Sequence, residues 1–285
     1  MFEELRQAAA QGEAAVKALC QMTGLSRAGY YRWRAPCPAV PVEVEVRDRI
    51  QRTAVEWPAY GYRRITAELQ RHGFAVNHKH VLRLMREDNL LCLRRRRFVV
   101  TTDSRHDFRV CSNLAAQITP GAVNQLWVAD ITNIRLRTEF VYLAVLLDAF
   151  SRRVIGWALG QTLEAELALA ALRMALAQRW PAPGLVHHSD RGVQYACHAY
   201  TDLLQQHEIR ISMSRKSNPW DNAACESFMK TLKYEEVHRN EYRDVHEARA
   251  CIGEFLERVY NRQRLHSALG YVPPAEFEQN AGELS

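Results

Sequence analysis

The chain has 285 residues, of which 47% are hydrophobic and 25% charged, a composition typical of a soluble protein with two or more globular units. No apolar run approaches the roughly 20 residues of a membrane span, and the amino-terminal MFEELRQ lacks the apolar core of a secretion signal. The seven cysteines lie far apart without a C-x-x-C pair, so neither a disulfide framework nor a zinc ribbon is indicated. We therefore expect a cytoplasmic protein with reduced thiols and no membrane partner.

The net charge of +6 is distributed unevenly along the chain. Residues 1–110 contain 20 Lys or Arg against 12 Asp or Glu, whereas residues 111–285 contain 18 against 20. This asymmetry is typical of a nucleic-acid-binding region attached to a separate domain, although a basic soluble surface would give the same totals.

Two helical segments are predicted in the basic part. In residues 1–38, an apolar helical pattern stops at Gly24, and Ser26 is placed to cap a second helix that carries Arg32. This matches a helix-turn-helix, and an ordinary helical hairpin would look the same.

Residues 39–97 are predicted to form a second helix-turn-helix-like segment. One helix should stop at Gly73, and Asn77 should cap the next, which turns Val81, Leu82 and Met85 inward. Basic residues on its outward side or just after it are candidate DNA contacts: Lys79, Arg83, Arg94, Arg95, Arg96 and Arg97.

Residues 98–124 lack periodicity and are predicted to be a linker, after which the pattern becomes mixed α/β. A meander of three strands is followed by alternating helix and strand, which predicts a mixed sheet with helices packed on it over residues 125–237. Residues 238–285 are predicted to be a helical extension of this core. The expected strands are 126–134, 140–147, 154–159, 185–188 and 209–213, and the expected helices are 164–179, 198–207, 222–237 and 246–261.

Three carboxylates in the α/β part are candidate metal ligands. Asp130 lies in the first strand, Asp190 directly after the fourth, and Glu226 within a helix. Charged groups at strand ends are costly unless paired or bound to metal, and Mg²⁺ prefers oxygen ligands. Any one of these residues alone could equally be a cap or an ion-pair partner.

The spacing of these residues also favours a shared metal site. Asp190 and Glu226 are separated by 35 residues, and Lys233 lies two helical turns after Glu226. Lys233, Lys230 and Asn222 would therefore share a helix face with the carboxylate and are candidate DNA contacts.

These motifs resemble a known family. WVADIT, HHSDRGVQY, SNPWDNAACESFMKTLKYEEV and YNRQRLHSALGYVPPAEFE are similar to the second-frame products of bacterial copy-out, paste-in insertion-sequence transposases, which have a retroviral-integrase-like catalytic core. The resemblance implies an RNase H-like fold and a DDE active site of Asp130, Asp190 and Glu226 that holds two Mg²⁺ or Mn²⁺ ions.

The resemblance also implies activity and partners. It implies metal-dependent nicking of double-stranded DNA at element ends, followed by 3′-hydroxyl strand transfer in at least a dimer. In this family the active enzyme is commonly a fusion with an upstream-frame protein that bears a leucine zipper. The chain shows no heptad zipper, so we expect it to be either a partial enzyme or a component that acts only with that partner.

Asp148, His187 and His188 are the other candidate ligands near the predicted site. Asp148 is predicted to be a turn cap or ion-pair partner. His187 and His188 are predicted to be structural or to support the metal-binding carboxylates, because a catalytic zinc site needs about three suitably spaced ligands. A regulator that binds element ends without cutting them and a nuclease for RNA–DNA hybrids are the alternative functions.

Overall fold

The computed structural model describes residues 26–34, 41–91, 111–215 and 222–283, together with Val16, Cys20, Gln21 and Gly24. Helix α3 (Arg27–Arg34) begins directly after Ser26, as predicted. Tyr30 on this helix is buried against Val16 and Cys20.

Helices α4, α5 and α6 form one helical unit around a shared apolar core. Gly73 has φ +84°, a left-handed conformation that favours glycine, and it ends the second helix. Asn77 caps the third helix, since its Oδ1 accepts backbone N–H bonds at 2.8 and 3.1 Å. The prediction for Leu82 was wrong: Leu84 is fully buried instead, and Leu82 is only half-buried. The bounds are α4 (Pro41–Glu56), α5 (Tyr62–Arg71) and α6 (His78–Glu87).

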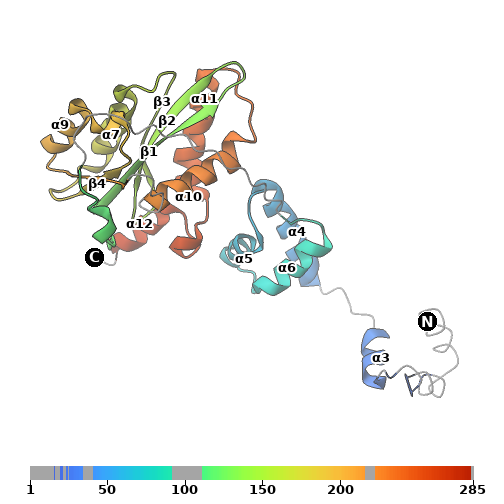
Figure 1. The fold of residues 1–285 in the computed structure, drawn as a ribbon. Helices are drawn as coiled ribbons and strands as arrows, with labels where there is room; N and C mark the ends of the chain where they lie inside the picture. Colours follow the sequence, from blue (N-terminus) through green and yellow to red (C-terminus); the bar gives the residue numbers. More distant parts are fainter. Residues whose placement is uncertain are drawn as a thin grey trace.

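A five-stranded sheet in the order β3-β2-β1-β4-β5 forms the centre of the larger unit (Figure 1). The first three strands are antiparallel neighbours, and β4 and β5 run parallel to β1. The meander and the crossovers match the prediction, with strand bounds within one or two residues. The strands are β1 (Leu126–Arg135), β2 (Phe140–Asp148), β3 (Val154–Gly160), β4 (Val186–Ser189) and β5 (Arg210–Met213).

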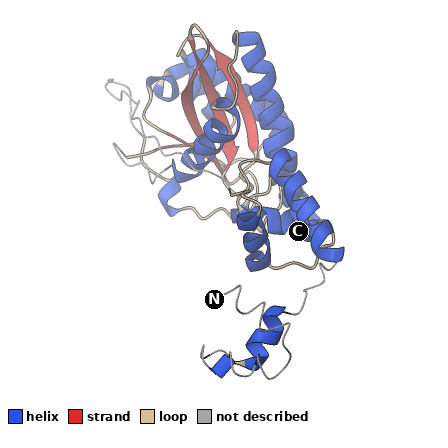
Figure 2. Cartoon of the chain, turned by 90° about the vertical axis from the view of Figure 1, so that its right-hand side faces the viewer, coloured by secondary structure: helices blue, strands red, loops and turns tan. Residues whose placement is uncertain are grey.

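Helices cover both faces of this sheet (Figure 2). Alternation along β1 separates two cores: Leu126 and Val128 face one, and Trp127 and Ala129 face the other. The first core is closed by α10, α11 and η4, and the second by α7, α8 and α9. The bounds are α7 (Ala165–Arg179), α8 (Val193–Ala196), α9 (His198–Gln206), α10 (Ala223–Leu232), α11 (Val245–Glu254) and η4 (Phe255–Gln263). This arrangement confirms the RNase H-like fold class.

Two long helices contain π-helical segments. Helix α10 continues without a break into η3 (Lys233–Val237), and α11 continues into η4. The chain then passes through η5 (Ser267–Leu269) to α12 (Pro274–Glu283). The sequence predicted each pair as one helix, and the π turns are additional features.

Short segments join the layers. A short 3₁₀ turn, η1 (Ala115–Gln117), is held on β5 by Ser212, whose Oγ accepts the N–H groups of Leu114 and Ala115. Asp148 is fully buried and accepts backbone N–H bonds from Asn124 and Ser151, which confirms the prediction of a turn cap. No helix within the described ranges is long and apolar enough to span a bilayer.

Candidate active site

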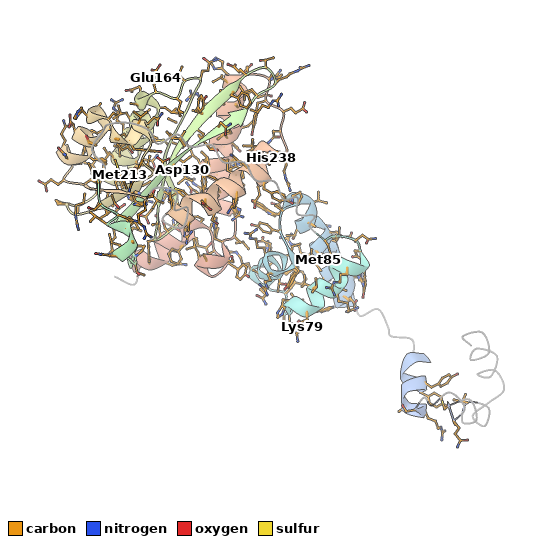
Figure 3. The ribbon with its side chains drawn as sticks, in the orientation of Figure 1. Lys79, Met85, Asp130, Glu164, Met213 and His238 are labelled. Carbon is orange, nitrogen blue, oxygen red and sulfur yellow. The ribbon has the colours of Figure 1, made fainter. Side chains whose placement is uncertain are left out.

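Strand pairing places Asp130 and Asp190 beside each other. Val128 of β1 is the parallel partner of His188 of β4, and each carboxylate follows two residues later along its strand direction. Side chains alternate with a period of two, so both carboxylates emerge from the same face of the sheet, Asp130 from the middle of β1 and Asp190 directly after the end of β4. Both side chains are half-buried, and Asp130 lies near the centre of the sheet (Figure 3).

Helix α10 brings Glu226 to the same face of the sheet. Asn222, at the start of this helix, donates from Nδ2 to the Ala129 carbonyl at 3.1 Å, which ties the helix to the residue before Asp130. Glu226 pairs with Lys230 at 3.3 Å, and its side chain is 39% exposed. The start of the helix is therefore fixed beside Asp130, while the Glu226 carboxylate points along the helix toward Lys230.

The electrostatics identify an uncompensated negative charge at Asp130. Burial, and then the neighbouring charge of Asp190, raise the pKa of Asp130 to about 7, and Glu226 adds a smaller increase. The Ile131 N–H and Lys233 oppose this rise. Burial lowers the pKa of Lys233, and the nearby Asp130 opposes that shift. The helix thus places one ammonium group within electrostatic reach of the carboxylate pair.

Gly192 is a site residue that sequence reasoning missed. Its N–H donates to Asp190 Oδ1 at 2.9 Å, and a Cβ at this position would lie 2.9 Å from the same oxygen. Any side chain here would displace the carboxylate. The Asp-Arg-Gly tripeptide in the sequence could have indicated this contact, since a glycine lets the backbone come close to a carboxylate two residues earlier.

The two histidines before Asp190 are structural in this arrangement. His187 is hydrogen-bonded to the Tyr200 hydroxyl at 2.9 Å, and His188 to Ser212 Oγ at 2.9 Å. Both are fully buried, and burial lowers the pKa of His187 to about 3. Trp220, for which the sequence leaves open core packing or stacking on DNA bases, lies outside the described residues.

The donor set fits a hard divalent cation. Two adjacent carboxylates, one with a raised pKa, provide oxygen ligands and negative charge that such an ion would neutralise. Within the described ranges, no three His, Cys, Asp or Glu side chains converge closely enough to hold a metal ion. Glu226 is engaged with Lys230 instead, in an exposed ion pair of a kind worth only about 0.3–0.5 kcal/mol. Its rotation toward the pair would therefore be inexpensive.

The predicted DNA contacts on the helical unit are at its surface. Lys79 and Arg83 are exposed on α6, and Figure 3 shows Lys79 on the side of the helix away from the sheet. Arg83 forms ion pairs with Glu87 at 2.9 Å and Glu43 at 3.4 Å. Arg32 lies on α3. Outside the described residues are Arg94, Arg95, Arg96 and Arg97.

Both the helical unit and the α/β unit match known protein families. Residues 120–219 and 207–274 match two families described as "Integrase core domain", and residues 41–98 match an "HTH-like domain". The sheet order, the neighbouring carboxylates of Asp130 and Asp190 and these matches define an integrase-core polynucleotidyl transferase of the DDE type.

Individual relatives place the chain in a narrower family of transferases. An "Insertion element IS600 uncharacterized 31 kDa protein" of Shigella sonnei is 38% identical over 271 residues, 94% of this chain and 100% of that protein. "Transposase InsF for insertion sequence IS3A" of Escherichia coli (strain K12) is 35% identical over 94% of this chain and 95% of that protein. Among solved structures, the HTLV-2 integrase catalytic core domain in complex with magnesium is 14% identical, covers 56% of this chain and 99% of that chain, and has a TM-score of 0.45. The chain belongs to the IS3 family of insertion-sequence transposases.

Proposed function

We propose that this transposase nicks DNA at the ends of its insertion sequence and joins the freed 3′ end to a second phosphodiester. The observation that supports this proposal is the half-buried pair of Asp130 and Asp190 beneath the helix that carries Glu226 and Lys233. A pair of carboxylates on adjacent strands, of which Asp130 has a raised pKa, suits the binding of divalent cations and phosphate groups.

Asp130 and Asp190 would hold Mg²⁺ or Mn²⁺, and Glu226 would complete the ligand set after leaving Lys230. Two such ions, when bound, would stabilise negative charge on the attacking and leaving oxygens. Lys233 would hold the phosphate that is to be cut, because it lies on the same helix within electrostatic reach of Asp130. Lys230, released by Glu226, and Asn222 would contact the DNA on either side of it.

The two steps are both displacements at phosphorus. In the first, a water molecule loses a proton and its oxygen bonds to phosphorus, while the bond from phosphorus to the 3′ oxygen breaks and that oxygen takes up a proton. In the second, this 3′ hydroxyl loses its proton and its oxygen bonds to another phosphorus, while that strand's 3′ oxygen leaves and takes up a proton. Each step forms one P–O bond and breaks one P–O bond, so no oxidant or nucleotide cofactor is required.

The helical segments would bind the terminal repeats. Lys79 and Arg83 on α6 are placed to meet a groove and its phosphates, with Arg32 and the Arg94–Arg97 run as further contacts. Joining two ends requires two active sites, so we expect at least a dimer on DNA. The upstream-frame protein, separate or fused, is the expected partner.

The decisive experiment uses labelled duplexes that end in the terminal repeat flanking the gene. They are incubated with Mg²⁺, Mn²⁺ or EDTA, with the chain alone and with the upstream-frame protein. We expect nicked and joined strands only with metal, and a loss of about 100-fold or more in Glu226→Gln. Glu254→Gln is the matched control, because Glu254, the last residue of α11, forms an exposed i,i+4 ion pair of the same kind with Arg258 of η4.

Two outcomes would contradict the proposal. Equal loss in both variants would mean that Glu226 has no specific role. Binding of ends without cutting, in every metal and with either partner arrangement, would favour an end-binding regulator, a function with which the Glu226–Lys230 pairing is compatible.

A further inference from the structure

The carboxyl-terminal part of the chain enters the core of the helical unit. Leu265, which follows η4, is 1% exposed and belongs to the same apolar cluster as Ile50 and Ile65. The Leu265 N–H donates to the Tyr60 hydroxyl at 2.8 Å, and Tyr60 is itself buried. The unit that should read DNA is therefore joined to the catalytic core through its interior as well as through the chain.

A buried ion pair lies at the same junction. Arg264 donates from Nε and Nη2 to the two carboxylate oxygens of Glu235, both at 2.7 Å. Their side chains are only 3% and 10% exposed. Arg64 of α5 lies 3.9 Å from Glu235 and places its guanidinium over the Tyr60 ring. A bidentate pair of this kind fixes direction as well as distance.

Glu235 belongs to the active-site helix. It lies in η3, which continues α10, so nine residues separate it from Glu226 and two from Lys233. At about 1.5 Å per residue, this separation is roughly 13 Å of continuous helix. A shift of Glu235 is therefore transmitted directly to the residues that would hold the metal and the phosphate.

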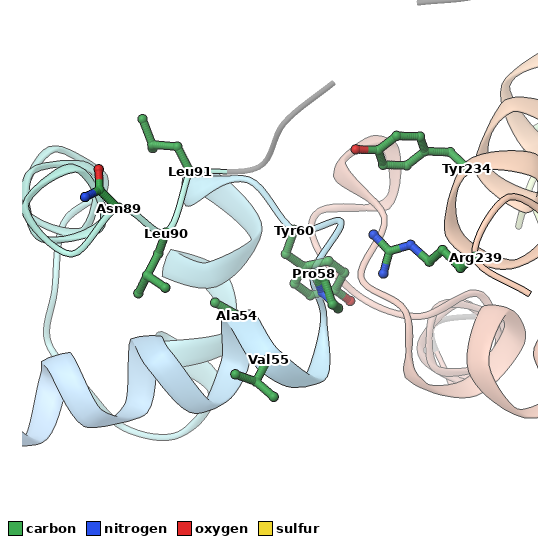
Figure 4. A pocket seen from close by; sticks show the side chains of 9 residues that line it. All are labelled: Ala54, Val55, Pro58, Tyr60, Asn89, Leu90, Leu91, Tyr234 and Arg239. Carbon is green, nitrogen blue, oxygen red and sulfur yellow. The ribbon is translucent and has the colours of Figure 1, made fainter. Parts of the chain in front are cut away.

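Apart from the contacts of Leu265 and Tyr271 with the helical core, packing between the two units is incomplete. A cavity of about 360 Å³ lies between them, with seven lining residues on the helical unit and Tyr234 and Arg239 on the other side (Figure 4). Elsewhere across the junction, Arg71 pairs with Glu276 at 2.7 Å, but both side chains are more than 30% exposed. We therefore expect the buried contacts of Glu235 and Tyr60 to determine the orientation of the helical unit relative to the catalytic core.

We propose that Glu235 and Arg264 are positioning residues that set which phosphodiester is cut relative to the sequence bound by the helical unit. The inference rests on the proposed nicking function. Neither residue contacts DNA in this scheme: each acts by holding α10 and η3 at a fixed distance from α5 and α6.

The test compares Glu235→Gln and Tyr60→Phe with the wild type in the full chain. Tyr60→Phe keeps the ring and removes only the hydroxyl that accepts the Leu265 N–H, so it serves if Glu235→Gln does not fold. Glu278→Gln is the matched control, because Glu278 is also 10% exposed and pairs with two arginines, Arg179 and Arg153, neither of which adjoins Leu265. Hydrogen exchange is measured on every variant without DNA, and the cut position is mapped at nucleotide resolution on the terminal-repeat duplex.

We expect faster exchange in α5 and around Leu265 for both junction variants, with exchange in β1 and β2 unchanged. Cuts should spread by about one or two nucleotides, since each nucleotide spans ~3.4 Å, while affinity for the end stays within about twofold. Glu278→Gln should cut at the wild-type position. A merely stabilising role would lower the yield of cuts without moving them.

Unchanged exchange, or unchanged cut positions in both junction variants, would overturn the proposal. If the wild type does not cut, the proposed function fails. Hydrogen exchange then tests the positioning role alone, and that role is supported only if exchange in α5 becomes faster in Glu235→Gln and not in Glu278→Gln.

Discussion

Replacing Asp130 by asparagine should stabilise the protein when divalent ions are withheld. The pKa of Asp130 rises from 3.8 to about 7 through burial and the charge of Asp190. At ~1.4 kcal/mol per pKa unit, ionising this group in the folded state costs at most about 4 kcal/mol. Because the side chain is partly exposed, water reduces this cost, and we expect a gain of about 2 kcal/mol, or roughly 4–8 °C in Tm.

The pH dependence of this gain has a definite sign. The folded pKa is raised, so the carboxylate lowers stability progressively as the pH rises from 3.8 to about 7, and fully above that. The Tm difference between Asp130→Asn and wild type in EDTA should therefore be near zero at pH 4 and greatest at pH 8. Added Mg²⁺ should raise the Tm of the wild type only.

Scanning fluorimetry over this pH range makes the measurement, with Asp202→Asn as the control because Asp202 is exposed on α9. Asp202→Asn should show no such pH-dependent gain. If Asp130→Asn is equal to or less stable than wild type at pH 8 in EDTA, the carboxylate is not an uncompensated charge and the reasoning fails.

Three further outcomes are expected. Gly156→Ala should lower the free energy of unfolding by about 3 kcal/mol or more, since the added Cβ would lie 2.2 Å from the Ala171 carbonyl oxygen. Thermal unfolding measures this loss, and Gly121→Ala is the control because Gly121 has open space around it. Asn77→Ala should cost about 1 kcal/mol by removing the α6 cap and weaken end binding in a gel-shift assay, and an unchanged melting temperature would contradict it. His187, with its pKa lowered to about 3, stays neutral in the fold, so stability should fall as the pH drops from 6.5 toward 3; NMR titration of its ring should show no protonation above pH 5.

The sequence predicted the sheet and its site because local patterns encode both. β-Branched and aromatic runs mark β1 to β3, and hydrophobic periodicity marks α7. The parallel pairing of Val128 with His188 then follows from the meander and crossover, and it brings Asp130 beside Asp190. Leu82 was assigned wrongly because α6 follows the i, i+3, i+4 spacing of Val81, Leu84 and Met85, and the leucines at 82 and 84 are equally apolar in the sequence.

Other features depend on contacts that no local pattern carries. The pairing of Glu235 with Arg264 joins residues 29 apart whose charges resemble any surface pair. Tyr60 and Leu265 are 205 residues apart, and only the assembled fold makes one the partner of the other. The turn of Glu226 toward Lys230 is a rotamer held by an exposed ion pair, and residue spacing does not specify a rotamer.

The placement of Leu265 inside the core of α4, α5 and α6 also orders events during synthesis. Those helices leave the ribosome long before Leu265 is translated, and at 5–20 residues per second the delay is on the order of ten seconds. Until then the nascent helical unit lacks one of its buried side chains and the bond to Tyr60. A truncated polypeptide would therefore carry a helical unit with an incomplete apolar core, and we expect it to be less stable than the same unit in the full-length chain.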